Sequence, residues 1–202
     1  MSDVSWANDT QAMKIAVYSG SFNPLHIGHM AIMEYLTTDM DFGMVYLVVS
    51  PKNPLKDSIS EESGRARFEA ARKAVEKSGL KVKAEDIELD MAAPHYTIRT
   101  LDALKEREPE NSFTLVIGAD NLAQIGRWKD YERILKEYGV VVYPRKGHDM
   151  EKLKAGLLET DRDFRIQLTD APMVDVSSTM IREMLAEGKD VSEYICLSLI
   201  HI

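Results

Sequence analysis

Short apolar segments rich in β-branched residues alternate along this chain with amphipathic segments of helical period. The apolar runs cover residues 15–19, 44–50, 80–89, 113–119, 139–144 and 165–171, and the helical stretches cover residues 26–38, 61–77, 96–108, 128–138 and 178–188. Parallel strands need crossover connections, and this alternation supplies a helix for most of them. The sequence therefore predicts an α/β fold, doubly wound around a mostly parallel sheet.

The segment GSFNPLHIGH follows the first predicted strand directly. In doubly wound sheets, ligands bind beyond the carboxyl ends of the strands, where the strand order reverses. Gly20, Ser21 and Phe22 place backbone amides at this turn, and the N-terminus of the next helix adds further free N–H groups. We therefore expect an anion site here, although the GxGxxG and GxxxxGK[ST] phosphate motifs are absent.

Two histidines stand at the start of the predicted helix. His26 and His29 are three residues apart, so they share one face of its first turn, where the helix dipole favours a phosphate. Gly28 between them leaves room for a ligand to approach the backbone. Each histidine alone could be a structural residue, but the combined pattern favours two donors to one polyphosphate.

A second polar constellation lies near the end of the chain, in residues 174–185 (VDVSSTMIREML). Ser177 or Ser178 is a suitable N-cap, and Arg182 follows Ser178 by four residues, on the same helix face. Hydroxyls, free amides and a guanidinium would then converge on one ligand. The alternative is a simple cap beside a solvated arginine.

Two loops at the same predicted edge add candidates. Lys52 and Lys56 follow the second strand and could bind polyphosphate oxygens, or be mobile surface lysines. After the fourth strand, Gly118 permits close backbone approach and Asp120 could accept from a ribose hydroxyl. Trp128 offers a flat face to an aromatic ring, or packs in the core.

The composition restricts the partners that the protein could bind and indicates its cellular compartment. The formal net charge of −8 argues against binding to nucleic acid or anionic membranes, but a local donor cluster could still bind a small anion. A single cysteine, Cys196, and the lack of an export signal or a membrane-length apolar run indicate a cytoplasmic protein.

The motifs together resemble a known family. HIGH after the first strand and SSTMIR near the end resemble the [TH]xGH nucleotidylyltransferase superfamily. With GSFNPLHIGH, NPLK, PHYTIRTLDAL and IGADNLAQIGRW, the chain resembles the bacterial nicotinate-nucleotide adenylyltransferases from about Lys14 to Glu187. The resemblance implies a Rossmann-like nucleotidylyltransferase fold and a role in NAD biosynthesis.

The resemblance also implies a reaction. The phosphate of nicotinate mononucleotide attacks the α-phosphate of ATP, giving deamido-NAD and pyrophosphate, with Mg²⁺ held mainly by the ATP phosphates and no dedicated metal site in the protein. His26, His29 and Arg182 would be the catalytic residues. ATP would be bound by these and by Gly20, Ser21, Phe22, Gly28, Lys56, Gly118, Asp120, Ser177, Ser178 and Thr179.

The acceptor site follows from the same resemblance. Nicotinate mononucleotide would be bound by Asn23, Lys52, Tyr96, Thr97 and Trp128. The alternatives are a related adenylyltransferase that uses nicotinamide mononucleotide or phosphopantetheine, or a nucleotide-binding protein without turnover. We expect a monomer or a small homo-oligomer.

The two ends of the chain are expected to lie outside the fold. Residues 1–12 are polar and aperiodic, which predicts a disordered extension, and residues 13–196 are expected to form one domain. The family continues with a helical segment similar to YIPxxVxxYI, whereas EYI here runs directly into CLSLIHI. The last six residues match one reading frame of a common sequencing adapter, so residues 197–202 are expected to be a non-native tail.

Overall fold

A six-stranded, fully parallel sheet forms the centre of the molecule. The computed structural model describes residues 12–51 and 61–195. The strand order is β3-β2-β1-β4-β5-β6, and the strands are β1 (Lys14–Gly20), β2 (Met44–Val49), β3 (Val82–Glu85), β4 (Ser112–Gly118), β5 (Val140–Tyr143) and β6 (Ile166–Leu168). The order reverses between β1 and β4, which are neighbours with Ile15 opposite Phe113. This arrangement confirms the predicted doubly wound fold.

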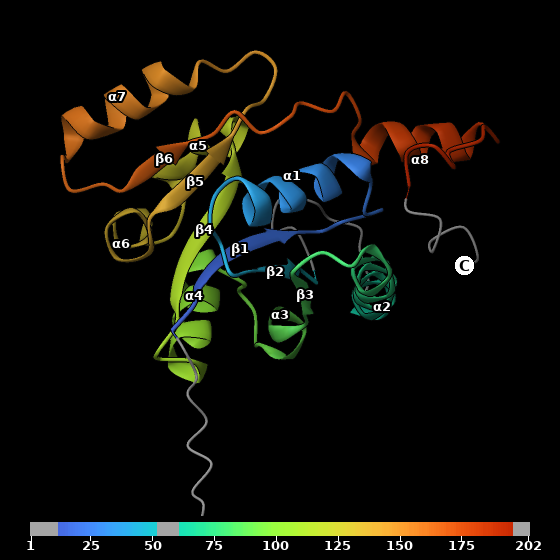
Figure 1. Ribbon diagram of the computed structural model, residues 1–202, viewed down its shortest axis with the longest axis horizontal. Coiled ribbons are helices and arrows are strands. Elements are labelled where there is room, and N and C mark those ends of the chain that lie inside the picture. Colours follow the sequence, from blue (N-terminus) through green and yellow to red (C-terminus); the bar gives the residue numbers. More distant parts are fainter. Residues whose placement is uncertain (1–11, 52–60, 196–202) are drawn as a thin grey trace, which may run out of the picture.

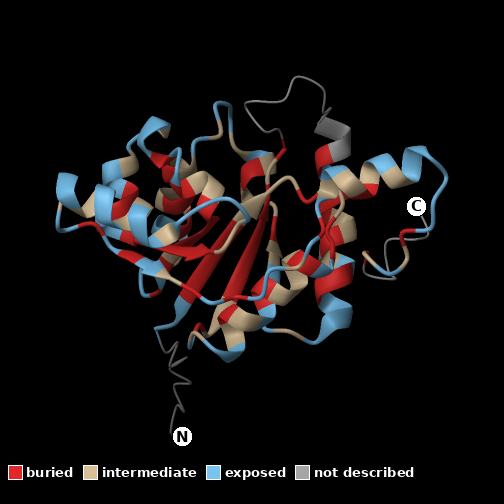
Figure 2. Ribbon diagram, turned by 90° about the horizontal axis from the view of Figure 1, so that it is seen from above, coloured by how far each residue is buried: buried red, intermediate tan, exposed pale blue. Residues whose placement is uncertain are grey.

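Helices cover both faces of the sheet (Figures 1 and 2). They are α1 (Ile27–Thr38), α2 (Glu61–Ser78), α3 (Ile87–Asp90), α4 (Thr97–Arg107), α5 (Ala119–Leu122), η1 (Ile125–Arg127), α6 (Tyr131–Arg133), η2 (Ile134–Tyr138), α7 (Met150–Thr160) and α8 (Ser178–Ala186). No helix in the described ranges is long and apolar enough to cross a membrane.

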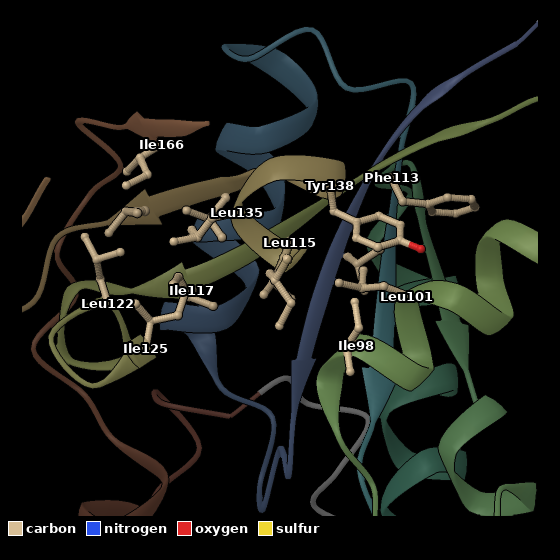
Figure 3. Close-up of a cluster of buried hydrophobic side chains, with 14 of the residues drawn as sticks. Ile98, Leu101, Phe113, Leu115, Ile117, Leu122, Ile125, Leu135, Tyr138 and Ile166 are labelled. Atoms are coloured by element: carbon tan, nitrogen blue, oxygen red, sulfur yellow. The ribbon is translucent and has the colours of Figure 1, made fainter. Parts of the chain in front are cut away.

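Successive residues of each strand point to opposite faces of the sheet, where they form two separate hydrophobic cores. Ile15, Leu115 and their neighbours on one face pack against α4, η2 and α7, as Figure 3 shows for part of this cluster. Ala16, Leu47 and their neighbours on the other face pack against α1 and α2. Each fully buried leucine or isoleucine contributes about 1.5–3 kcal/mol of transfer free energy.

The structure differs from the predicted elements in three places. The expected strand 80–89 is a strand only over β3, and its second half turns into the single helical turn α3. The expected helix over 128–138 is broken into α6 and the π-helical turn η2. Helix α7 was not predicted, although its apolar residues Met150, Leu153, Leu157 and Leu158 follow the helical spacing i, i+3, i+7 and i+8.

Helix α8 lies at one end of the molecule, beside the amino end of α1 and far from α7 (Figure 1). Its buried residue Ile181 belongs to a small third cluster with Val176, Val191 and Ile195. The segment after α8 returns to α1, where the Ile27 N–H donates to the Tyr194 carbonyl at 2.9 Å. The start of α1 is therefore held by the carboxyl-terminal part of the chain.

Candidate active site

A cavity of about 760 Å³ opens at the carboxyl edge of the sheet, where β1, β4 and β5 end. Three parts of the chain line it: the start of α1, the segments after β4 and β5, and the turn before α8. Its lining includes His26, Gly28, His29, Asp120, Arg145, Lys146, His148, Val176 and Ser177. The two distant motifs of the sequence therefore meet in one cavity at the point where the strand order reverses.

The two histidines form a stacked pair at the amino end of α1. His26 is the N-cap and is 3% exposed. Its ring stacks on that of His29, with centroids 3.6 Å apart and planes inclined by 26°. The His26 backbone N–H donates to Nδ1 of His29 at 3.2 Å. Neutral His29 must therefore carry its proton on Nε2, which makes that nitrogen a donor for a ligand.

Burial keeps both imidazoles neutral in the free protein. It lowers the pKa of His26 from 6.5 to about 4, with a further contribution from the positive charge of Arg145. Burial also lowers the pKa of His29 well below its ordinary value, and His26 and Arg145 add to that effect. The His26 Nδ1 is buried and has no hydrogen-bond partner in the described structure. A negative charge bound in the cavity would favour protonation of the two rings.

Close packing fixes the position of the pair. The Phe22 ring meets the His29 ring edge-on, with centroids 5.0 Å apart. A Cβ on Gly28 would come within 3.1 Å of both His26 Nδ1 and Val176 Cγ1. Gly28 thus lines the cavity and also allows the turn before α8 to pack closely against the histidine.

An arginine that the sequence reasoning missed lies across the cavity. Arg145 follows β5; its Nη2 donates to the Tyr143 hydroxyl at 3.2 Å, and its Nε lies 3.8 Å from Oδ1 of Asp120. That Nε and that Oδ1 are both buried without a hydrogen bond in the described structure. A Cβ on Gly118 would be 2.3 Å from the same Asp120 oxygen. Gly118 therefore allows Asp120 and Arg145 to lie side by side at the end of β4.

The sequence did contain a signal for this arginine. The string RKGH, residues 145–148, follows the buried run of β5 directly, so it reaches the same edge as HIGH. Arg145, Lys146 and His148 all line the cavity. Arg145 and Lys146 bring two positive charges to a cavity that the carboxylates of Asp120 and Asp175 also line.

The turn before α8 binds the loop that precedes the histidines. Ser177 is the N-cap and accepts from the Met180 N–H at 3.1 Å, which resolves the choice between Ser177 and Ser178. The Ser178 hydroxyl donates to the Pro24 carbonyl at 3.0 Å. These contacts leave Ser177 on the cavity and turn Ser178 toward the loop.

Arg182 takes part in the same attachment. Its Nη1 donates to the Asn23 carbonyl at 2.6 Å, and its Nη2 donates to the Thr179 hydroxyl at 3.0 Å. It is not among the residues that line the cavity. Arg182 thus orients the histidine-bearing loop.

The residues assigned to the acceptor lie away from this cavity. Tyr96 is the N-cap of α4 and is 41% exposed, and Thr97 begins that helix. Trp128 ends η1 and packs against the main core. None of these three residues lines the cavity described above, and Lys52 and Lys56 lie outside the described residues.

The chain is similar to known proteins over most of its length. The cytidylyltransferase-like family model matches residues 17–184. A protein of Flavobacterium johnsoniae is 37% identical over 179 residues, covering 89% of this chain and 90% of its own length. A protein of Porphyromonas gingivalis is 38% identical over 185 residues, which cover 92% of this chain and 90% of its own length. Both are named "probable nicotinate-nucleotide adenylyltransferase".

A solved structure shares the fold. The nicotinic acid mononucleotide adenylyltransferase of Plasmodium falciparum, complexed with NaAD, superposes with a TM-score of 0.73 at 20% identity. The match covers 93% of each chain.

Proposed function

The chain belongs to the cytidylyltransferase-like family, and on this premise we propose that it transfers AMP from ATP to nicotinate mononucleotide. An oxygen of the mononucleotide phosphate attacks the α-phosphorus of ATP and forms the new P–O bond. The bond between the α-phosphorus and the bridging oxygen breaks, and pyrophosphate leaves. The other product is deamido-NAD, which places the protein in NAD biosynthesis.

One observation carries the proposal: the histidine pair of α1 and the serine turn of α8 line a single cavity that also holds Arg145. Two residues that line it, His26 and Arg145, each have a buried nitrogen (Nδ1 and Nε) that forms no hydrogen bond in the described part of the chain. Buried polar atoms are normally hydrogen-bonded, so these two residues are candidates for contact with a ligand. Imidazole and guanidinium nitrogens suit the oxygens of a polyphosphate.

The chemistry needs little from the protein beyond position and charge. The attacking phosphate is already an anion, so no general base is required, and oriented donors stabilise the charge that develops on the leaving pyrophosphate. We assign His26 and His29 to the ATP phosphates. Arg182 has N–H groups left after its bonds to Asn23 and Thr179. These are assigned, with Ser177 and Thr179, to the departing pyrophosphate.

Magnesium fits this site as a companion of ATP. Asp120 and Asp175 are the carboxylates on the cavity, and the described residues contain no cluster of three or more metal-ligating side chains. An ion bound mainly by phosphate oxygens and water is consistent with such a donor set. It would neutralise part of the triphosphate charge, and Asp120 could accept from its bound water.

We assign the acceptor, nicotinate mononucleotide, to the face of the sheet that α4 covers, opposite the face covered by α1. Tyr96 and Thr97 at the start of α4, Asn23 and Trp128 are the candidates for contact with nicotinate mononucleotide. Donors to the nicotinate carboxylate would favour the acid over the amide.

Pyrophosphate release tests the proposal directly. The protein with ATP and Mg²⁺ is incubated in parallel with nicotinate mononucleotide, nicotinamide mononucleotide and phosphopantetheine. We expect the fastest turnover with the first. Equal or faster turnover with another acceptor would overturn the substrate assignment, and ATP binding without any turnover would identify a non-catalytic nucleotide-binding protein.

A further inference from the structure

A buried arginine on α2 holds together the two loops that leave β1 and β2. Arg67 is 8% exposed. Its Nη1 donates to the Ser50 carbonyl at 3.0 Å and also to the Ser21 carbonyl. Its Nη2 donates to the Pro51 carbonyl at 2.9 Å. One guanidinium thus binds three backbone oxygens from two loops.

This arrangement is unusual for a buried charge. Among the side chains that the structure describes, which exclude those of residues 52–63, no carboxylate pairs with Arg67. Burying a charge costs free energy, which the charge-assisted bonds to the carbonyls offset. An apolar side chain would leave the carbonyls of Ser21, Ser50 and Pro51 without this donor, so the arginine serves to hold these backbone oxygens.

The first of the two loops that Arg67 joins leads from β1 to the histidine pair of the candidate active site. β1 and β2 are adjacent and parallel, and the ladder continues one bond further through the Ser50 N–H and the Gly20 carbonyl at 2.9 Å. Beyond that bond the two chains separate. Arg67 bridges them at this point, so it fixes where the loop toward the histidines begins.

A short path connects Arg67 to His29. Because the peptide unit is planar, holding the Ser21 carbonyl also sets the orientation of the Phe22 N–H. Phe22 has a left-handed backbone conformation, with φ of 41°. Its ring is 5% exposed and rests edge-on against His29. Movement of Ser21 would therefore displace the ring that supports the imidazole.

Other donors hold the rest of this loop in the same manner. The Asn23 carbonyl accepts from Arg182, and the Pro24 carbonyl accepts from Ser178. The carbonyls of Ser21, Asn23 and Pro24 are thus all bound by donors from α2 or α8. A carbonyl oxygen directed at a polyphosphate would repel it, so binding these oxygens elsewhere favours an anion site.

We propose that Arg67 is a positioning residue for the nucleotide site, which holds the Ser21 carbonyl and the Phe22 ring so that His29 meets the ATP phosphates. The proposal rests on the proposed function. It assigns no direct contact between Arg67 and the substrate. Its effect is on geometry, and small displacements of a reacting group cost large factors in rate.

The test compares R67K and R67A with R72K. Arg72 lies on the same helix and pairs with Glu69 and Glu76 at the surface, so R72K controls for a change of arginine in α2. Lysine at position 67 keeps the charge but cannot bridge three carbonyls. We expect R67K to lower kcat/KM for ATP on the order of ten- to a hundredfold and to shift the His29 ring resonances. R72K should keep the wild-type kcat/KM and the wild-type resonances.

Chemical rescue separates positioning from folding. Free guanidinium, at concentrations well below those that unfold the protein, is expected to restore part of the activity of R67A and none of that of a His29→Ala variant. If R67A does not fold, the kcat/KM and the His29 resonances of R67K test the proposal instead. Folded R67K with wild-type kcat/KM and unchanged His29 resonances would overturn the proposal.

Failure of the proposed function gives a different result. If the wild-type protein transfers no AMP, ATP affinity measured by calorimetry replaces kcat/KM as the readout. Weaker binding to R67K than to R72K, with the same His29 shift, then supports the role of Arg67, and equal affinities overturn it.

Discussion

The imidazole rings of His26 and His29 stack 3.6 Å apart, and the backbone N–H of the first donates to Nδ1 of the second. The N-cap residue and the third helical residue thus fix each other. Two neutral rings can stack in this way, whereas two imidazolium ions would repel each other at this distance. The neutral pair is therefore organised by the fold itself, and a bound polyphosphate would supply negative charge that favours its protonation.

Removal of His29 should affect the rate more than binding. We expect His29→Ala to lower kcat on the order of a hundredfold, because a donor to a growing negative charge is lost. KM for nicotinate mononucleotide should change little. Steady-state pyrophosphate release measures both. His29→Asn, which keeps a donor, should retain more activity, and an unchanged kcat in the alanine variant would exclude the assigned role.

The stability of the protein should fall as the medium becomes acidic. The unfolded chain protonates His26 below pH 6.5, whereas the folded protein resists protonation until about pH 4. The contribution of His26 to the free energy of unfolding should therefore be constant above pH 6.5. It should decrease by up to about 3 kcal/mol as the pH falls from 6.5 to 4. His29 contributes with the same sign.

Urea denaturation at a series of pH values measures this effect. His26→Asn serves as the comparison, since it removes one titrating group while the carboxylates remain. Its unfolding free energy should depend less on pH over this window. Identical slopes for the two proteins would contradict the pKa assigned to His26.

A methyl group at Gly118 should disturb the nucleotide site. Its Cβ would lie 2.3 Å from Asp120 Oδ1 and 3.1 Å from Arg145 Cγ, so both side chains must move. We expect Gly118→Ala to weaken ATP binding roughly tenfold, or about 1.4 kcal/mol, as measured by calorimetry.

Gly156 provides the matched control. It lies inside α7 with nothing within 4 Å of its Cβ position. Gly156→Ala should raise stability by about 0.5–1 kcal/mol and leave ATP binding unchanged. Equal ATP affinity in the two variants would show that Asp120 and Arg145 do not contact the nucleotide.

Trp128 tests the acceptor assignment. If its ring stacks on the nicotinate, Trp128→Ala should raise KM for nicotinate mononucleotide roughly tenfold, since base–aromatic stacking contributes about 1–3 kcal/mol. KM for ATP should be unaffected. Because Trp128 also packs against the core, kinetics are measured well below the unfolding temperature. Trp128→Phe should be milder, and a larger effect on ATP would place the ring in the other subsite.

The sequence by itself determined the layered α/β architecture, the position of the histidines at the first helix and the serine cap before the last. These depend on local features: the periods of two and 3.6 residues, and the preference of serine for an N-cap. The break in residues 80–89 escaped this reasoning because VKAEDIEL is compatible with both periods.

Only the tertiary structure decided which groups surround the histidines. Arg145 meets Asp120 because β4 and β5 are neighbours, and Arg67 of α2 and Arg182 of α8 bind the loop of residues 21–24 from two distant parts of the chain. Such contacts depend on chain topology and packing, which leave no periodic trace around either partner. The same packing lowers the histidine pKa values, since burial is a property of the folded molecule.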